Sequence, residues 1–184
     1  MTAAPLIEVR GLRSQFGDHV VHDHLDLDVR EGEILGIVGG SGTGKSVLIN
    51  TILGLKKPDA GEVYFRGEAM SGLTGKDRLA LEKRWGVLFQ SGALFSALTV
   101  RENVMAPMRE HVRMPVSLMK ELADLKIGLV GLAGEAGGKF PAELSGGMKK
   151  RAGLARALAL SPPYLSCSRR RCWRRRHPHP QWRR

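Results

Sequence analysis

The sequence has few cysteines and no long apolar run. Both cysteines, Cys167 and Cys172, lie near the C-terminus, so residues 1–160 contain neither a disulfide framework nor the paired cysteines of a zinc site. No segment approaches the roughly 20 consecutive apolar residues that span a bilayer, and the N-terminus lacks the apolar stretch of a secretory signal peptide. These absences exclude a disulfide-stapled secreted fold and a membrane-spanning helix, and we expect a cytosolic chain.

Acidic residues are missing from residues 161–184, and this shortage explains most of the high net charge. The chain carries a formal charge of +11, of which the eight arginines of that segment supply +8, leaving +3 for residues 1–160. The body of the protein is thus only mildly basic, and its charge does not indicate a nucleic-acid or membrane partner. With 184 residues and 42% apolar content, the chain is long enough for one domain with a sizeable core.

Apolar periodicity predicts a strand-rich beginning, an α/β centre and a helical second half. Residues 33–39, EILGIVG, form a short continuous apolar run of the kind found in strands buried on both faces. The other predicted strands are 6–12, 24–29, 61–67 and 85–90, and the predicted helices are 45–55, 77–84, 100–108, 117–132 and 148–160.

A glycine-rich segment, GGSGTGKS, lies between the predicted strand 33–39 and the predicted helix 45–55. It fits the pattern G-x-x-x-x-G-K-[ST], in which backbone N–H groups and the positive end of the helix surround a phosphate. Lys45 adds a positive charge, and the Ser46 hydroxyl is a ligand for Mg²⁺. A chance glycine turn is the alternative, but the flanking strand and helix favour a phosphate loop. The predicted nucleotide-binding residues are Gly39, Gly40, Ser41, Gly42, Thr43, Gly44, Lys45 and Ser46.

A second glycine motif, Leu144-Ser145-Gly146-Gly147, runs directly into the predicted helix 148–160. Its backbone N–H groups could bind an anion at the start of that helix. The alternative is a helix start capped by serine. Taken alone, the motif favours the serine cap. Its occurrence together with a phosphate loop is much harder to explain by chance and favours an anion-binding role.

The phosphate loop, the segment VLFQ at 87–90 and the LSGG motif together resemble the ATP-binding subunit of ABC transporters, over about Leu6 to Leu165. The resemblance implies an α/β fold: a P-loop NTPase domain of the ABC type, with an N-terminal antiparallel β subdomain and a helical subdomain. It also implies that ATP and Mg²⁺ are the ligands and that two ATP-binding subunits form a homodimer. The signature loop would cap the γ-phosphate on the partner subunit; its residues here are Leu144, Ser145, Gly146, Gly147 and Met148.

Two further positions follow from the same resemblance. Gln90 matches the glutamine that contacts Mg²⁺ beside Ser46 and transmits the nucleotide state to the membrane subunits; a polar strand end is the alternative. Phe16 falls where the family places an aromatic ring that stacks on adenine; a core phenylalanine is the alternative.

Residues 86–115 and the methionine after LSGG are similar to one branch of this family, the ATPase of the Mce-associated phospholipid transporters of bacteria, also called the lipid-asymmetry or toluene-tolerance family. That likeness implies lipid transport between the inner and outer membranes. The implied partner is a membrane permease subunit, with no nucleic acid, and the implied location is cytoplasmic, peripheral on the inner membrane through the permease.

The resemblance to the family ends near Leu165. There the family continues into an apolar strand that ends in Asp-Glu, where the aspartate holds Mg²⁺ and the glutamate polarises the attacking water. This chain has SCSRRRCWRRR instead, and His177 and His179 match no switch histidine. We therefore expect an ABC-transporter ATP-binding domain over residues 1–165, truncated before this strand and lacking the C-terminal part of the core. It would be deficient in hydrolysis, with no catalytic residue.

The expected tail, residues 166–184, is interpreted as an out-of-frame, unstructured arginine-rich segment. Two functional alternatives remain open. One is a non-hydrolysing nucleotide-binding module with a regulatory role. The other is a P-loop protein that binds nucleic acid through its arginine tail. A metal site is disfavoured, because three arginines lie between Cys167 and Cys172.

Overall fold

The computed structural model describes residues 5–90 and 92–167, and its N-terminal half forms an antiparallel sheet. β1 (Ile7–Phe16) pairs on one edge with β2 (His19–Val29) and on the other with β3 (Ala60–Phe65), which continues into the short β4 (Glu68–Ala69). Side chains of Ile7 and Val9 are buried on the same face of β1, as alternation requires. The strands predicted at 6–12, 24–29 and 61–67 are therefore confirmed.

Two helices accompany this sheet. α1 (Lys45–Ile52) directly follows the glycine-rich segment, and α2 (Gly75–Glu82) follows a 3-10 turn, Met70–Gly72. Leu48 and Ile52 lie on one face of α1 and are buried in a cluster with the apolar face of the sheet. This packing fixes the start of α1, and with it the glycine-rich segment, relative to β1 and β2. The other buried members of the cluster are Leu6, Ile7, Val9, Leu12, Val63, Phe65 and Leu81.

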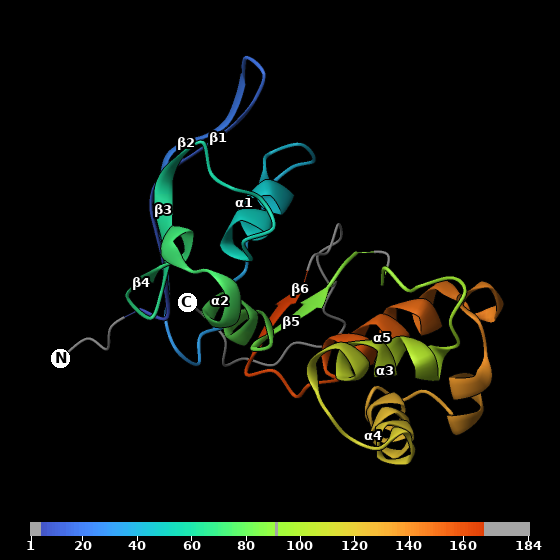
Figure 1. Cartoon of the computed structure of the whole chain (residues 1–184). Helices are drawn as coiled ribbons and strands as arrows, with labels where there is room; N and C mark the ends of the chain where they lie inside the picture. Colours follow the sequence, from blue (N-terminus) through green and yellow to red (C-terminus); the bar gives the residue numbers. More distant parts are fainter. Residues whose placement is uncertain (1–4, 91, 168–184) are drawn as a thin grey trace, which may run out of the picture.

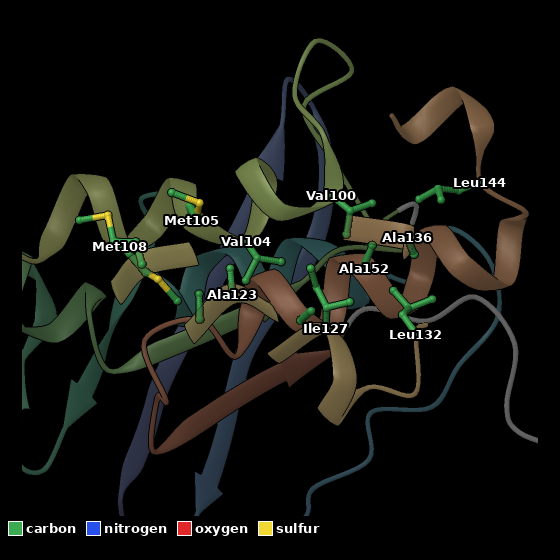
Figure 2. Close-up of a cluster of buried hydrophobic side chains, with 13 residues drawn as sticks. Val100, Val104, Met105, Met108, Ala123, Ile127, Leu132, Ala136, Leu144 and Ala152 are labelled. Carbon is green, nitrogen blue, oxygen red and sulfur yellow. The ribbon is translucent and has the colours of Figure 1, made fainter. Parts of the chain in front are cut away.

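The second half of the chain packs three helices together: α3 (Val100–His111), α4 (Val116–Leu129) and α5 (Gly146–Ala157), with 3-10 turns at Gly134–Gly138 and Pro141–Glu143. Figure 2 shows the core of this helical lobe, where the side chains of α3, α4 and α5 meet. A capping box starts α3: the amide of Glu102 donates to Thr99 Oγ1 (3.3 Å), and Thr99 N donates to the Glu102 carboxylate (2.9 Å). All three predicted helices are confirmed.

A small parallel sheet lies between the helical lobe and the lobe formed by the antiparallel sheet with α1 and α2 (Figure 1). β5 (Trp85–Leu88) pairs with β6 (Tyr164–Cys167) in the register Trp85↔Tyr164 to Leu88↔Cys167. The expected start of the unstructured tail at residue 166 is wrong by two residues, because Ser166 and Cys167 pair through their backbones as part of β6. The rest of the expected tail, 168–184, lies outside the described residues.

The predicted buried strand at residues 33–39 is not formed. These residues have no regular structure, and the side chains of Ile34 and Val38 are 99% and 80% exposed. A parallel strand is stabilised only by neighbours on its edges. Within the part of the chain that the structure describes, no strand pairs with this segment. Its apolar sequence alone is therefore not sufficient to form a strand. Among the described helices, none is both long and apolar enough to cross a membrane.

Candidate functional site

The phosphate loop, residues 39–46, lines an open cavity of about 1240 Å³, whose other walls come from β1, β2, α1 and the small parallel sheet. Phe16 and Gln90 line the same cavity, although they come from the end of β1 and from just beyond β5. The structure therefore brings the predicted nucleotide-binding and Mg²⁺-binding residues together around one cavity. The residues of the signature loop do not line it.

Backbone geometry curls the phosphate loop around the side chain of Lys45. Gly42 and Gly44 have φ angles of +84° and +85°, which favour glycine because a Cβ is strained there. The ammonium of Lys45 donates to the carbonyl oxygens of Gly39 (2.8 Å) and Gly40, and Thr43 Oγ1 also donates to Gly40 (3.0 Å). A positive charge is thus held on the inner side of the loop.

The N-terminus of α1 adds to this positive potential. Its N-cap is Gly44, which has no side chain to accept a hydrogen bond, and no acidic residue lies in the first turn. The first N–H groups of the helix and the positive end of its dipole therefore face the loop without a compensating negative charge from α1 itself. A phosphate group is the ligand chemistry that this arrangement favours.

Gly44 lies directly against β2. A Cβ atom on Gly44 would come within 2.4 Å of Val21 Cγ1 and 2.6 Å of His22 Nε2. His22 is buried, and its Nδ1 atom has no hydrogen-bond partner among the described residues. Burial, and secondarily the positive charge of Lys56, lower the pKa of His22. The neutral imidazole therefore packs under the phosphate loop, a role that the sequence patterns did not reveal.

Ser46 and Gln90 each carry an oxygen atom of the kind that binds Mg²⁺. Both line the main cavity and a smaller adjacent cavity formed with Val87, Phe89 and Ser166, among others. Hydroxyl and amide oxygens are ligands that Mg²⁺ accepts, usually together with phosphate oxygens and water. No cluster of three His, Cys, Asp or Glu side chains suited to a metal occurs in the described residues. A Mg²⁺ ion here would thus depend on a bound phosphate.

Phe16 ends β1 and is 55% exposed on the cavity. The ammonium of Lys56 lies 5.2 Å from the centre of its ring, a cation–π contact that helps to orient it. The ring is therefore not a core side chain, which was the alternative reading of the sequence. Adenine stacking remains a prediction.

The signature loop lies at the start of α5 in the helical lobe. Leu144 is buried in the helical core, whereas Ser145, Gly146 and Gly147 are exposed. Ser145 Oγ accepts from the amide of Met148 (3.3 Å), so this serine also serves as the helix cap. Apart from its chain neighbours and the backbone of its own helix, no atom of the described residues would lie within 4 Å of a Cβ on Gly146. Packing among the described residues therefore does not require a glycine at this position.

Sequence reasoning also missed Arg156, near the end of α5. Its guanidinium donates to the carbonyl oxygens of Gly92 and Ala93, two residues in the loop that follows Gln90. The available signal was its place in AGLARALAL, where one arginine stands among small and apolar residues on a helix with a buried face.

Comparison with known proteins agrees with these features. The sequence profile described as "ABC transporter" matches residues 22–167. The chain is 45% identical over 160 residues to the intermembrane phospholipid transport system ATP-binding protein MlaF of Haemophilus influenzae, covering 87% of this chain and 60% of that protein. It is 41% identical over 161 residues to the probable ribonucleotide transport ATP-binding protein mkl of Mycobacterium leprae, covering 88% and 46%. The chain thus spans less than two thirds of these relatives.

Solved structures show the same fold. The ATP-binding cassette MJ0796, in a dimeric post-hydrolysis state bound to ADP and Pi, matches with a TM-score of 0.79 and 30% identity over 86% of this chain and 72% of that one. The protein cbiO1 of Clostridium perfringens, part of the ABC transporter complex cbiONQ, matches with a TM-score of 0.73 and 26% identity, covering 88% of this chain and 64% of that one.

Proposed function

This chain belongs to the ABC transporter family, and on that premise we propose that it is the ATP-binding subunit of a bacterial transporter that moves phospholipid between membranes. The predicted family and fold class are confirmed by the profile match and by the solved structures. The 45% identity to MlaF of Haemophilus influenzae supports the phospholipid cargo, and the 41% identity to mkl, whose name refers to ribonucleotide transport, leaves that cargo as the alternative.

The geometry of the phosphate loop is the observation that supports nucleotide binding most strongly. Lys45 lies inside a curled glycine loop at the uncapped N-terminus of α1, in a cavity shared with Phe16 and Gln90. The β- and γ-phosphates of ATP would bind the loop amides and Lys45, with adenine on the ring of Phe16. Ser46 and Gln90 would hold Mg²⁺, which neutralises the phosphate charge.

A second copy of the subunit would complete the site. Ser145, Gly146 and Gly147 are exposed on the helical lobe and do not line the cavity of their own chain. In a homodimer, these residues would cap the γ-phosphate bound to the partner's phosphate loop. A membrane permease subunit would hold this pair at the cytoplasmic face of the inner membrane.

We further propose that this sequence binds ATP without hydrolysing it at a useful rate. β6 ends in Ser166 and Cys167, and no acidic residue follows Glu143 in the sequence. The Glu143 carboxylate accepts from the amide of Phe140 (2.6 Å), and that of Glu102 accepts from Thr99, whose hydrogen bonds lower the pKa of Glu102. Both carboxylates are engaged in helix starts, so neither is placed to orient an attacking water.

Calorimetric titration of the 184-residue chain with MgATP tests the nucleotide-binding claim. We expect Lys45→Ala to weaken binding by about 10- to 100-fold, since a charged hydrogen bond contributes about 1.5–3 kcal/mol. Lys57→Ala is the matched control, because Lys57 is exposed outside the cavity and should leave the affinity unchanged. Equal affinity in the wild-type chain and Lys45→Ala would contradict the phosphate-loop assignment.

A further inference from the structure

We propose that Arg156 is a positioning residue that fixes Gln90 relative to the signature end of α5. The inference rests on the proposed function, because it concerns the metal-binding part of the nucleotide site. It goes beyond that function by assigning a single side chain as the link between the loop that follows Gln90 and the helix that begins at the signature loop.

Arg156 contacts three residues of the loop that follows Gln90. Its Nη1 donates to the carbonyl oxygen of Ala93 (2.5 Å) and its Nη2 to that of Gly92 (3.2 Å). The guanidinium carbon lies 5.7 Å from the centre of the Phe95 ring. A planar guanidinium can make two such bonds and a ring contact together, whereas the ammonium of lysine cannot reproduce that geometry.

The charge of Arg156 has no carboxylate partner in the described residues, since none of their ion pairs includes it. Burial lowers the pKa of this guanidinium, which shows that the protein environment disfavours its charge. Ala93, one of its two acceptors, has a φ of +46°, which non-glycine residues rarely adopt. A half-buried cation without a counter-ion thus holds a strained backbone, a combination more typical of a functional site than of an ordinary surface contact.

Two glycines bring α5 into direct backbone contact with the same loop. A Cβ on Gly153 would lie 2.7 Å from Gly92 Cα, and a Cβ on Gly92 would lie 2.8 Å from the carbonyl oxygen of Lys149. Farther along, the buried Asn103 of α3 donates to the carbonyl of Phe95 (3.0 Å) and accepts from its amide (2.7 Å). Residues 92–95 are therefore attached to the helical lobe.

Gln90 stands between this attached loop and the small parallel sheet. The amide of Gly92 donates to the carbonyl of Phe89 (2.9 Å), closing a turn that contains Gln90. Figure 1 shows the chain leaving β5 and crossing to α3 beside α5. Because α5 carries Ser145 at its start and Arg156 near its end, a shift of the signature end would be transmitted to Gln90 and hence to a Mg²⁺ ion shared with Ser46.

ATP affinity measured with and without metal tests this role in the full chain. Calorimetry with Mg²⁺ and with EDTA gives the factor by which the metal strengthens ATP binding, which we call the metal factor. We expect Arg156→Lys to reduce that factor by about tenfold, the loss of one hydrogen bond to a charged group, with ATP affinity in EDTA unchanged. Gln90→Ala should cause the same loss, and the double variant should lose no more than either single variant.

Arg151→Lys is the matched control. Arg151 lies on the same helix and donates to a loop carbonyl, that of Gly131 (2.8 Å), but it does not touch the loop after Gln90. Gly153→Ala is a second variant, which removes no charge and favours the helix but forces α5 away from Gly92. It should reduce the metal factor as Arg156→Lys does, while thermal unfolding shows that both variants still fold.

The proposal is overturned if wild-type binding does not depend on Mg²⁺, if Arg156→Lys keeps the wild-type metal factor, or if it lowers affinity equally in Mg²⁺ and EDTA. An additive double variant would also overturn it, as would an effect of Arg151→Lys equal to that of Arg156→Lys. Lys45→Ala separates this failure from failure of the proposed function. If Lys45→Ala weakens binding in both conditions while Arg156→Lys has no effect, only the positioning role is wrong.

Discussion

Gly44 and His22 are packed so closely that only a hydrogen atom fits between them: a Cβ on Gly44 would lie 2.6 Å from Nε2 of His22. Gly44 is the N-cap of α1, and His22 belongs to β2. The antiparallel sheet therefore packs against the phosphate loop, and the position of α1 depends on a strand residue that precedes Gly44 by 22 positions in the sequence.

Replacing Gly44 should impair both folding and binding. Gly44→Ala places a Cβ at a φ of +85° and against Val21 and His22, so α1 must move. We expect a loss of at least about 1 kcal/mol in unfolding free energy and weaker MgATP binding. Gly36→Ala is the control, since a Cβ there meets no atom within 4 Å among the described residues beyond its chain neighbours. Equal stability of the two variants in urea unfolding would contradict the packing described here.

His22 should make stability depend on pH. Its pKa lies below the ordinary 6.5, because burial disfavours the charged ring. Below about pH 6.5 the unfolded chain then binds more protons than the folded chain, so stability is fully present above that pH and is lost as the pH falls through the lower folded value. Urea unfolding between about pH 7.5 and 5.5 should show a smaller loss for His22→Leu than for wild type.

Val20, an exposed residue of β2 without an ionisable side chain, provides the control. Val20→Ala should keep the wild-type dependence of stability on pH. A His22→Leu variant with the same pH dependence as wild type would show that the buried ring does not titrate as described.

Phe16 should contribute to binding of the base and not of the phosphates. Stacking on an aromatic ring is worth about 1–3 kcal/mol per base, so Phe16→Ala should weaken MgATP binding by roughly 5- to 100-fold. Binding of inorganic triphosphate should be unchanged, and Phe16→Tyr should restore ATP affinity. If Phe16→Ala weakens ATP and triphosphate equally, the ring supports the loop and does not stack on adenine.

Elements that depend on local sequence were predictable. The periodicity of residues 100–108 and 117–132 predicts α3 and α4, and the spacing of Gly39, Gly44 and Lys45 predicts a curled loop before a helix. These features require only neighbours along the chain. The confirmed family followed from the combination of local motifs, because the phosphate loop and LSGG are each short and continuous in sequence.

Features that depend on distant partners were not predictable. Residues 33–39 have the composition of a buried strand, but a strand needs edge partners, and none pairs with them in the described structure. The contact between Gly44 and His22, and that between Arg156 and Ala93, join elements far apart in sequence. The periodicity of one element does not predict which residue of a distant element will contact it.

The central claim is that this chain binds MgATP and does not turn it over. Equilibrium dialysis with γ-labelled MgATP, followed by chromatography of the protein-bound label, tests both parts together. We predict that the wild-type chain retains label as intact ATP and that Lys45→Ala retains much less. Retention no greater than that of Lys45→Ala would contradict binding. Conversion to phosphate near the roughly 1 s⁻¹ lower end of ordinary enzymes, abolished by Lys45→Ala, would contradict the hydrolytic deficiency.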